Sequence, residues 1–128
     1  MGTWAVSDPP LETLREADAL NDVRPALDQL VTAFGANAVG RLIDVRPATI
    51  SNWRRGKRNM DRPSARRILD LHYVLTRAFQ TFQPQTAMRW LVAADPFLDE
   101  QRPLDVLVLE GPARVVAAID AHEVGAYP

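Results

Sequence analysis

The residues of this sequence best suited to a chemical task are cations and small hydrogen-bonding side chains between Val45 and Arg58. Pro47 suits the first turn of a helix, where its missing N–H would have no intrahelical partner. Gly56 suits the left-handed position just past a helix end. Ile50 and Trp53 are three residues apart and can point inward together. The outward side would then carry side chains that can contact base edges in a DNA major groove, namely Ala48, Ser51, Asn52 and Arg55.

A second short helix is predicted immediately before this one, over Asn37 to Asp44. Its apolar residues have the spacing of a helix face that covers a core; they are Val39, Leu42 and Ile43. Gly40 should weaken this helix by up to ~1 kcal/mol relative to alanine. Two short helices joined by the tight connection Asp44–Arg46 describe a helix-turn-helix.

The second helix resembles the Xre-type helix-turn-helix family, where it commonly reads Thr-Ile-Ser-x-Trp-x-x-Gly-Lys-Arg. The matching residues are Thr49, Ile50, Ser51, Trp53, Gly56, Lys57 and Arg58. Two departures are Gly40, where the family usually has alanine, and Asp44, where it usually has glycine in the turn. Asp tolerates left-handed conformations, so the second departure is mild. The predicted DNA-binding residues are Arg46, Ala48, Thr49, Ser51, Asn52, Arg55, Lys57 and Arg58.

The charge distribution agrees with this prediction. The 128-residue chain has a net charge of −1, yet residues 41–67 hold 9 basic and 2 acidic residues, a net +7. Residues 1–40 carry −4 and residues 95–128 carry −5. A basic segment centred on the predicted recognition helix is the electrostatic footprint of a nucleic-acid contact. The alternative is that these cations form a solvent-exposed surface without a nucleic-acid partner.

Composition excludes several other classes of function. The chain has no cysteine, so neither a disulfide framework nor a thiolate site is possible. His72 and His122 have no neighbour at a metal-ligand spacing, and no phosphate-binding glycine loop is present. Asp95, Asp99 and Glu100 cluster in the sequence, but no pattern indicates that they are buried. We therefore expect a protein that is not an enzyme and needs no metal or cofactor.

No apolar run approaches the ~20 residues of a membrane span, and the acidic N-terminus is unlike a secretory signal. A soluble cytoplasmic protein is expected.

Two helices are predicted before the helix-turn-helix. Ser7 or Asp8 can cap a first helix that includes Leu20, and a second helix is predicted from Pro25 to Phe34.

The longest predicted helix runs from Arg62 to Gln83, capped by Asp61 and ended by Pro84. Its apolar residues form one stripe at helical spacing: Ile68, Leu71, Leu75, Phe79 and Phe82. Leu69 and Tyr73 form a second apolar edge, which predicts burial on more than one side. Such a helix is either the central strut between two lobes or a dimer interface. His72 lies between the edges and is interpreted as a hydrogen-bonded packing residue.

Short helices are predicted beyond Pro84, over residues 85–94 and 104–109 and from Pro112 to about Gly125. No segment alternates with a period of two, so no sheet is expected. This region resembles a second family, the toxin-binding domain shared by MbcA, ParS and Xre antitoxins. The matching residues are Trp90, Leu91, Pro96, Leu98, Arg102 to Asp105, Leu107, Glu110, Gly111, Val115 or Val116, Ile119, Gly125 and Tyr127. Asp99 and Glu100 depart from the family, which often has glycines there.

The resemblance implies an antitoxin that neutralises a RES-domain toxin. The family's toxins destroy NAD by hydrolysis or phosphorolysis, and the antitoxins are all-helical dimers whose C-terminal region blocks the entrance to the toxin's active site. The residues implied in toxin contact are Glu123, Gly125, Ala126, Tyr127 and Pro128. The net −5 of residues 95–128 suits the cationic cleft of a protein that binds an anionic dinucleotide. Tyr127 can be an interface residue, or it can close the core of its own lobe.

The predicted fold is all-α. An N-terminal helical domain with the helix-turn-helix (residues 1–83) is joined by a long helix to a small toxin-binding domain (residues 84–128). Three hypotheses for function follow. The first is an antitoxin, homodimeric within a larger toxin–antitoxin complex, that also represses its own operator DNA. The second is a plain transcriptional repressor without a toxin partner. The third is an antitoxin whose helix-turn-helix has lost affinity for DNA.

Overall fold

The computed structural model describes residues 19–125, and within that range the chain forms seven α-helices, one short 3-10 helix and no β-strand. An isolated antiparallel bridge joins Asp95 and Gln101. The predicted all-α fold class is confirmed. Within the same range, every helix is too short or too polar to cross a membrane.

The chain divides into two compact units, and the boundary lies between His72 and Tyr73. This boundary falls inside the longest helix, α5 (Arg62–Thr81), whereas the sequence placed it after residue 83. Each unit has its own set of fully buried apolar side chains. In the first they include Val23, Leu27, Leu30, Val39, Ile50, Ile68 and Leu71, and in the second Val74, Leu75, Leu91, Leu98, Val106, Val115 and Ile119.

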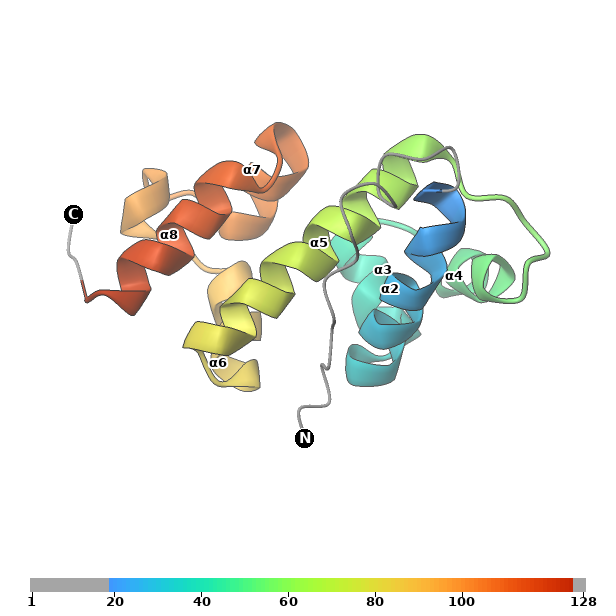
Figure 1. The fold of residues 1–128 in the computed structure, drawn as a ribbon, viewed down its shortest axis with the longest axis horizontal. Helices are drawn as coiled ribbons and strands as arrows, with labels where there is room; N and C mark the ends of the chain where they lie inside the picture. Colours follow the sequence, from blue (N-terminus) through green and yellow to red (C-terminus); the bar gives the residue numbers. More distant parts are fainter. Residues whose placement is uncertain (1–18, 126–128) are drawn as a thin grey trace. The chain divides into compact units, whose positions relative to one another are not determined.

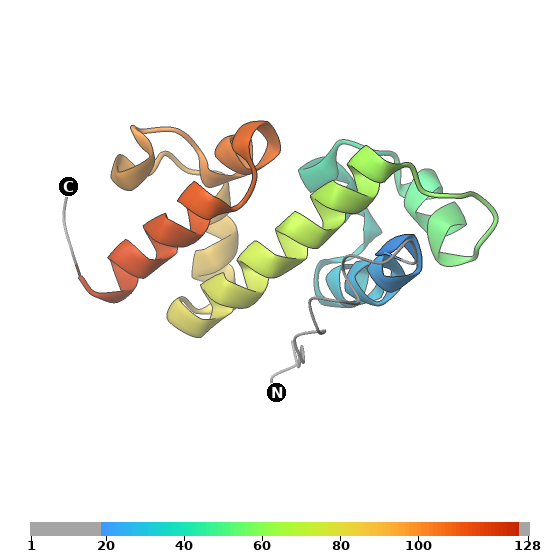
Figure 2. The same ribbon diagram turned by 45° about the horizontal axis from the view of Figure 1, so that its top comes forward.

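The first unit is built from α2 (Ala19–Phe34), α3 (Ala36–Ile43), α4 (Pro47–Arg54) and the start of α5. Helices α2, α3 and α4 contact one another pairwise, and Figure 1 shows them gathered beside the beginning of α5. An irregular segment over residues 55–61 connects α4 to α5 (Figure 2). Asp61 ends that segment, and its carboxylate accepts a hydrogen bond from the backbone N–H of Ser64 at 3.2 Å. The predicted N-terminal cap of α5 is therefore confirmed.

The prediction that a helix begins at Pro25 is wrong. Pro25 lies inside α2, and Leu20, which the sequence assigned to a preceding helix, belongs to α2 as well. A proline in this place removes a single backbone hydrogen bond. Burial of Val23, Leu27 and Leu30 along one face of the helix outweighs that loss. The capping residues Ser7 and Asp8 lie outside the described residues.

The stripe on α5 is buried as predicted at Ile68, Leu71 and Leu75, and half-buried at the two phenylalanines. The second apolar edge is not covered by the chain itself, because Leu69 is half-buried and the Tyr73 residue is 49% exposed. This edge is therefore not fully buried within the single chain, and the dimer-interface alternative stays a prediction. The tyrosine hydroxyl makes such a position compatible with water.

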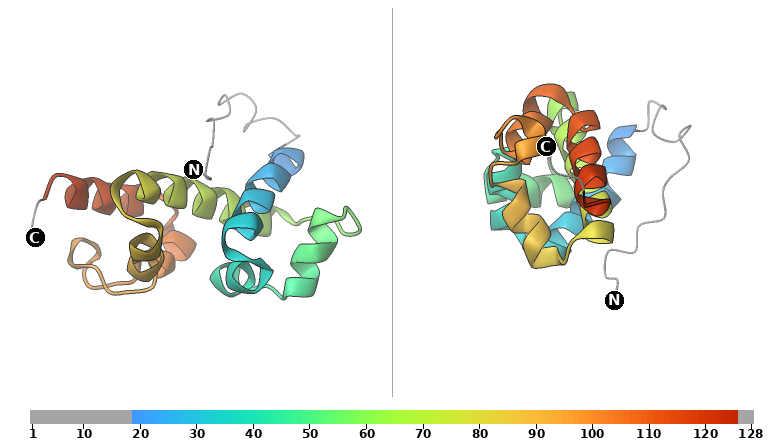
Figure 3. Two further views of the ribbon diagram at one scale, coloured as in Figure 1. Left: turned by 90° about the horizontal axis from the view of Figure 1, so that it is seen from below. Right: turned by 90° about the vertical axis from the view of Figure 1, so that its left-hand side faces the viewer.

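The second unit consists of the end of α5, α6 (Pro84–Leu91), a 3-10 helix η1 (Pro96–Leu98), α7 (Pro103–Glu110) and α8 (Ala113–Glu123). Helix α8 contacts α7 and η1, and α6 contacts α7. The segment between α6 and α7, which includes η1, forms a loop that Figure 3 shows in orange. Prolines stand at the start of α6, η1 and α7, where their fixed φ suits the first helical turn.

Candidate functional site

The helix-turn-helix predicted from the sequence is formed by α3 and α4. Helix α4 begins at Pro47 and its last turn is closed by Gly56, whose φ of +72° is the left-handed conformation expected there. Ile50 and Trp53 are 0% and 3% exposed and fix α4 in the core of the first unit. Their burial decides which side of α4 faces outward.

The eight predicted DNA-binding residues lie on or beside the outward side of α4. Thr49, Ser51 and Asn52 are half-buried, and the others are exposed, namely Arg46, Ala48, Arg55, Lys57 and Arg58. The structure therefore brings small polar side chains and cations together on one accessible surface. Their contact with DNA stays a prediction.

The connection between α3 and α4 depends on unusual backbone conformations. Asp44 ends α3 in the left-handed conformation, with φ 61° and ψ 50°, at the position where Xre-type sequences usually have glycine. Gly40 accepts a hydrogen bond from the N–H of Val45 at 2.9 Å. A Cβ atom on residue 40 would lie 2.5 Å from the Val45 carbonyl oxygen. Gly40 is consequently required for this turn, and its cost to α3 is offset by the close approach that it permits.

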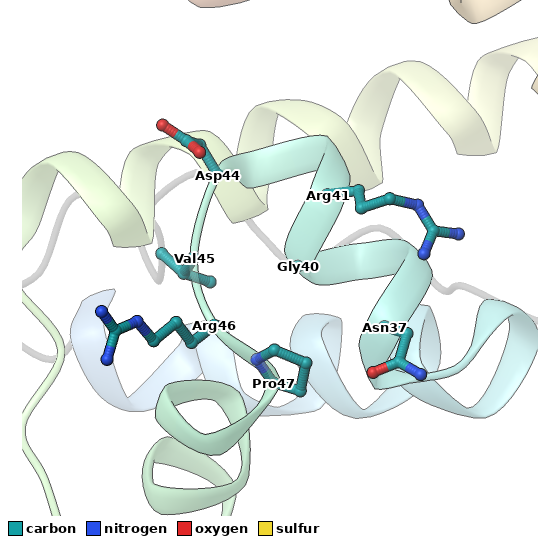
Figure 4. Close-up of a pocket in the computed structure, with 7 residues that line it drawn as sticks. All are labelled: Asn37, Gly40, Arg41, Asp44, Val45, Arg46 and Pro47. Atoms are coloured by element: carbon teal, nitrogen blue, oxygen red, sulfur yellow. The ribbon is translucent and has the colours of Figure 1, made fainter.

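A shallow hollow of about 460 Å³ lies at this turn, lined by Asn37, Gly40, Arg41, Asp44, Val45, Arg46 and Pro47. Figure 4 shows the side chains of Arg41 and Arg46 leaving the turn in opposite directions. The hollow thus has a cation on either side, next to the first turn of α4. This arrangement suits contact with a phosphate backbone.

Two arginines near this surface have structural partners. Arg54 donates from Nε to the Asp28 carboxylate at 2.8 Å, which ties α4 to α2. Arg67 donates from Nη1 to the carbonyl oxygen of Ile43 at 3.3 Å, which ties α5 to the end of α3. Arg67 is itself exposed, and this bond supports the end of α3.

The second unit contains a buried carboxylate that the sequence did not predict. Asp95 is 1% exposed, and its oxygens accept hydrogen bonds from the indole Nε1 of Trp90 at 2.6 Å and the backbone N–H of Phe97 at 2.7 Å. Nε2 of His122 lies 2.6 Å from the same carboxylate. We call Trp90, Asp95, Phe97 and His122 the Asp95 cluster. No sequence pattern indicated this burial, because a residue in an Asp-Pro turn has no periodic signal.

Hydrogen bonding decides the protonation of Asp95. Burial would raise the pKa of its carboxyl, but the hydrogen bonds from Trp90, His122 and Phe97 outweigh burial and hold the pKa below its ordinary value of 3.8. The carboxylate is therefore ionised and can only accept, so Nε2 of His122 is the donor. His122 also meets the ring of Phe97 edge-on, with the centroids 4.9 Å apart. The predicted packing role of His122 is confirmed.

The residues implied in toxin contact follow His122. Glu123 ends α8 and is exposed, and Gly125 has a φ of +72°. Ala126, Tyr127 and Pro128 lie outside the described residues, so the two alternatives for Tyr127 remain. In the other unit, His72 is hydrogen-bonded to Gln29, as its interpretation as a packing residue required. Among residues 19–125, no group of three histidine or acidic side chains could hold a metal ion.

Sequence comparison matches this chain to proteins named mycobacterial cidal antitoxin MbcA from Mycobacterium bovis and Mycobacterium tuberculosis. The identity is 29% over 90 residues, which cover 70% of this chain and 79% of each relative. This chain is homologous to the MbcA antitoxins. No family model matches the sequence.

The fold of this MbcA homologue is also that of a solved structure. It matches a chain of the crystal structure of the M. tuberculosis MbcT–MbcA toxin–antitoxin complex with a TM-score of 0.68 and 22% identity. The match covers 83% of this chain and 97% of the other. The match covers more of the chain than either unit holds, so the likeness in fold extends into both units.

Proposed function

We propose that this protein is an antitoxin that binds and neutralises a RES-domain toxin by blocking the entrance to the toxin's NAD-degrading site. The observation that carries the proposal is homology to MbcA over 90 residues, which are 70% of the chain. The relative's fold was solved in complex with its toxin, MbcT. The choice of a RES-domain partner rests on the resemblance of residues 85–128 to the shared toxin-binding domain of MbcA, ParS and Xre antitoxins.

The described part of the second unit has features that suit this role. Helix α8 ends in exposed residues: Glu123, the 77% exposed Val124 and Gly125. An apolar side chain exposed at a helix end, next to a carboxylate, can enter a cationic cleft. In this proposal the protein acts by binding alone.

We further propose that the first unit binds operator DNA, so that the antitoxin represses its own promoter. The accessible side of α4 carries Ser51 and Asn52, which can hydrogen-bond to base edges, and Arg55, which can bond to guanine. The adjacent cations, Lys57 and Arg58, are exposed and can contact phosphates. A homodimer would place two recognition helices ~34–36 Å apart, one DNA turn, on an inverted repeat.

The deciding experiment is co-expression of this protein with the RES-domain protein encoded beside it, followed by purification of the complex and an assay of NAD loss. A stable complex in which NAD is preserved is the expected result. Absence of a complex, with NAD still consumed, would leave the plain transcriptional repressor as the better account.

Deletion of Gly125 to Pro128 should abolish neutralisation and leave DNA binding intact. A truncated protein that still protects NAD would remove the blocking role from the C-terminal end.

Titration of promoter DNA distinguishes the remaining hypotheses. Affinity that falls steeply with salt and depends on sequence supports an autorepressor. If the toxin is neutralised but no specific complex with DNA forms, the helix-turn-helix acts as a scaffold only.

A further inference from the structure

The last turn of α8 contacts the rest of the second unit through the side chain of His122, which is bonded to Asp95. His122 is half-buried, and each described residue after it is exposed. The last backbone hydrogen bonds of the helix run from the N–H of Val124 to the Asp120 carbonyl at 3.2 Å and from the N–H of Gly125 to the His122 carbonyl at 3.1 Å. These two bonds are local to the last turn. Ala118 and Ile119, which are 2% and 0% exposed, anchor the body of α8. Beyond them, the side chain of His122 makes the bonded contact closest to the end of the helix.

The partner of His122 is held more firmly than an ordinary surface carboxylate. Both oxygens of Asp95 are hydrogen-bonded, one to the N–H of Phe97 and the other to Trp90 and His122. The main chain of Asp95 is also fixed, since its carbonyl accepts hydrogen bonds from Leu98 and Glu100, both at 2.9 Å. The Asp95 carboxylate is thus a rigid acceptor buried between α6 and η1.

Aromatic rings restrict the imidazole further. The ring of Phe97 lies 4.9 Å, that of Phe82 5.7 Å and that of Trp90 6.5 Å from the His122 ring, centroid to centroid. All three pairs are edge-on or nearly so. Edge-on packing limits rotation of the ring, so Nε2 is kept in line with the carboxylate. Asp120, two residues before His122, forms an exposed ion pair with Arg77, and such exposed pairs contribute little.

We propose that the Asp95–His122 hydrogen bond is a positioning device that sets the direction in which the toxin-contacting end of the chain leaves the second unit. This inference rests on the proposed antitoxin function and deepens it. His122 and Asp95 do not touch the toxin in this account. They reduce the number of orientations of the residues after His122 before binding, which lowers the entropic cost of inserting them into a cleft.

Hydrogen exchange in the free protein tests the structural half of the inference without a toxin. We expect His122→Phe to keep a ring edge-on to Phe97 but to lose the bond to Asp95. Exchange at the amides of Val124 and Gly125 should accelerate at least tenfold, whereas amides within α7 should be unchanged. His122→Gln can still donate from its amide to Asp95, and it should restore slow exchange. Unchanged exchange in His122→Phe would overturn the proposal.

Neutralisation of the co-expressed RES-domain protein tests the functional half. His122→Phe should raise the antitoxin concentration needed for half-protection of NAD about tenfold, and His122→Gln should recover most of this loss. His72→Phe is the matched control, because it removes an imidazole from the first unit; it should change neither readout. Faster exchange together with unchanged neutralisation would also overturn the proposal. If the unmodified protein fails to protect NAD while the exchange results hold, it is the antitoxin function that fails.

Discussion

Gly40 and the carbonyl oxygen of Val45 approach so closely that a Cβ on residue 40 would lie 2.5 Å from that oxygen. The N–H of Val45 in turn donates to the Gly40 carbonyl. The helix-turn-helix is therefore closed by main-chain contact between a helix residue and the turn that follows it. The Xre-type sequences that this motif resembles usually have alanine at this position, which the geometry of this turn leaves no room for.

Gly40→Ala should destabilise the protein even though alanine is the better helix former. The gain in helix propensity is up to ~1 kcal/mol, whereas overpacking against main chain costs ~1–3 kcal/mol. Urea unfolding should show a net loss of free energy of unfolding. Ala38→Gly in the same helix is the control and should cost ~0.5–1 kcal/mol through propensity alone. A more stable Gly40→Ala variant would show that the turn can relax.

Glu100→Gly should stabilise the second unit. Asp99 and Glu100 have φ angles of 55° and 64°, left-handed conformations that are strained for residues with a side chain. The toxin-binding domain that residues 85–128 resemble often has glycines here, in agreement with these angles. Relief of the strain should raise the free energy of unfolding by up to ~1 kcal/mol, measured as a rise in the midpoint of thermal unfolding. Gln101→Gly, next in the chain and outside the left-handed positions, should give no such gain.

Asp95 should make stability depend on pH in the acid range. Its folded-state pKa is held below 3.8 by the hydrogen bonds of the Asp95 cluster, against the effect of burial. The folded state therefore binds fewer protons than the unfolded state, and the stabilisation is complete above the unfolded pKa and is lost as pH falls through the folded value. The difference in unfolding free energy between the wild type and Asp95→Asn should shrink on titration from about pH 5 downward. A difference that is independent of pH would contradict the ionised carboxylate.

Removal of the Asp95 side chain should be more harmful than its neutralisation. In Asp95→Ala the indole of Trp90 and the N–H of Phe97 lose their acceptor, and each unpaired buried donor costs ~1–3 kcal/mol. Chemical denaturation of the two variants compares them directly. Equal stability of Asp95→Ala and Asp95→Asn would mean that water replaces the carboxylate.

Arg55→Ala and Asn52→Ala should each weaken operator binding by ~1–3 kcal/mol and leave toxin binding unchanged. Arg54 is the matched control, since its guanidinium is bonded to Asp28. Arg54→Ala should therefore have a smaller effect than Arg55→Ala in a titration of promoter DNA at fixed salt. Operator affinity that is unchanged in both the Arg55 and the Asn52 variant would remove these residues from the set that reads DNA.

Most of the helices of this protein are determined by local sequence. Pro47, Gly56, Asp61, Pro103 and Gly111 mark helix ends through fixed φ, left-handed backbone or a capping carboxylate, and the structure has helix ends at or next to each of them. The accessible side of α4 was also predictable, because Ile50 and Trp53 occupy one face of a short helix. These signals act over a few residues, so they can be recognised in the sequence without knowledge of the tertiary structure.

The tertiary structure alone decided the contacts between distant residues. Asp95 and His122 are 27 positions apart, and nothing in their local sequence shows that one is buried and bonded to the other. Pro25 lies within a helix because burial of its neighbours outweighs a local rule. Gly40 is needed because of a carbonyl oxygen in the next turn, not because of its own helix. In each case the deciding energy comes from packing or desolvation between separate elements, and those energies are set only when the chain has folded.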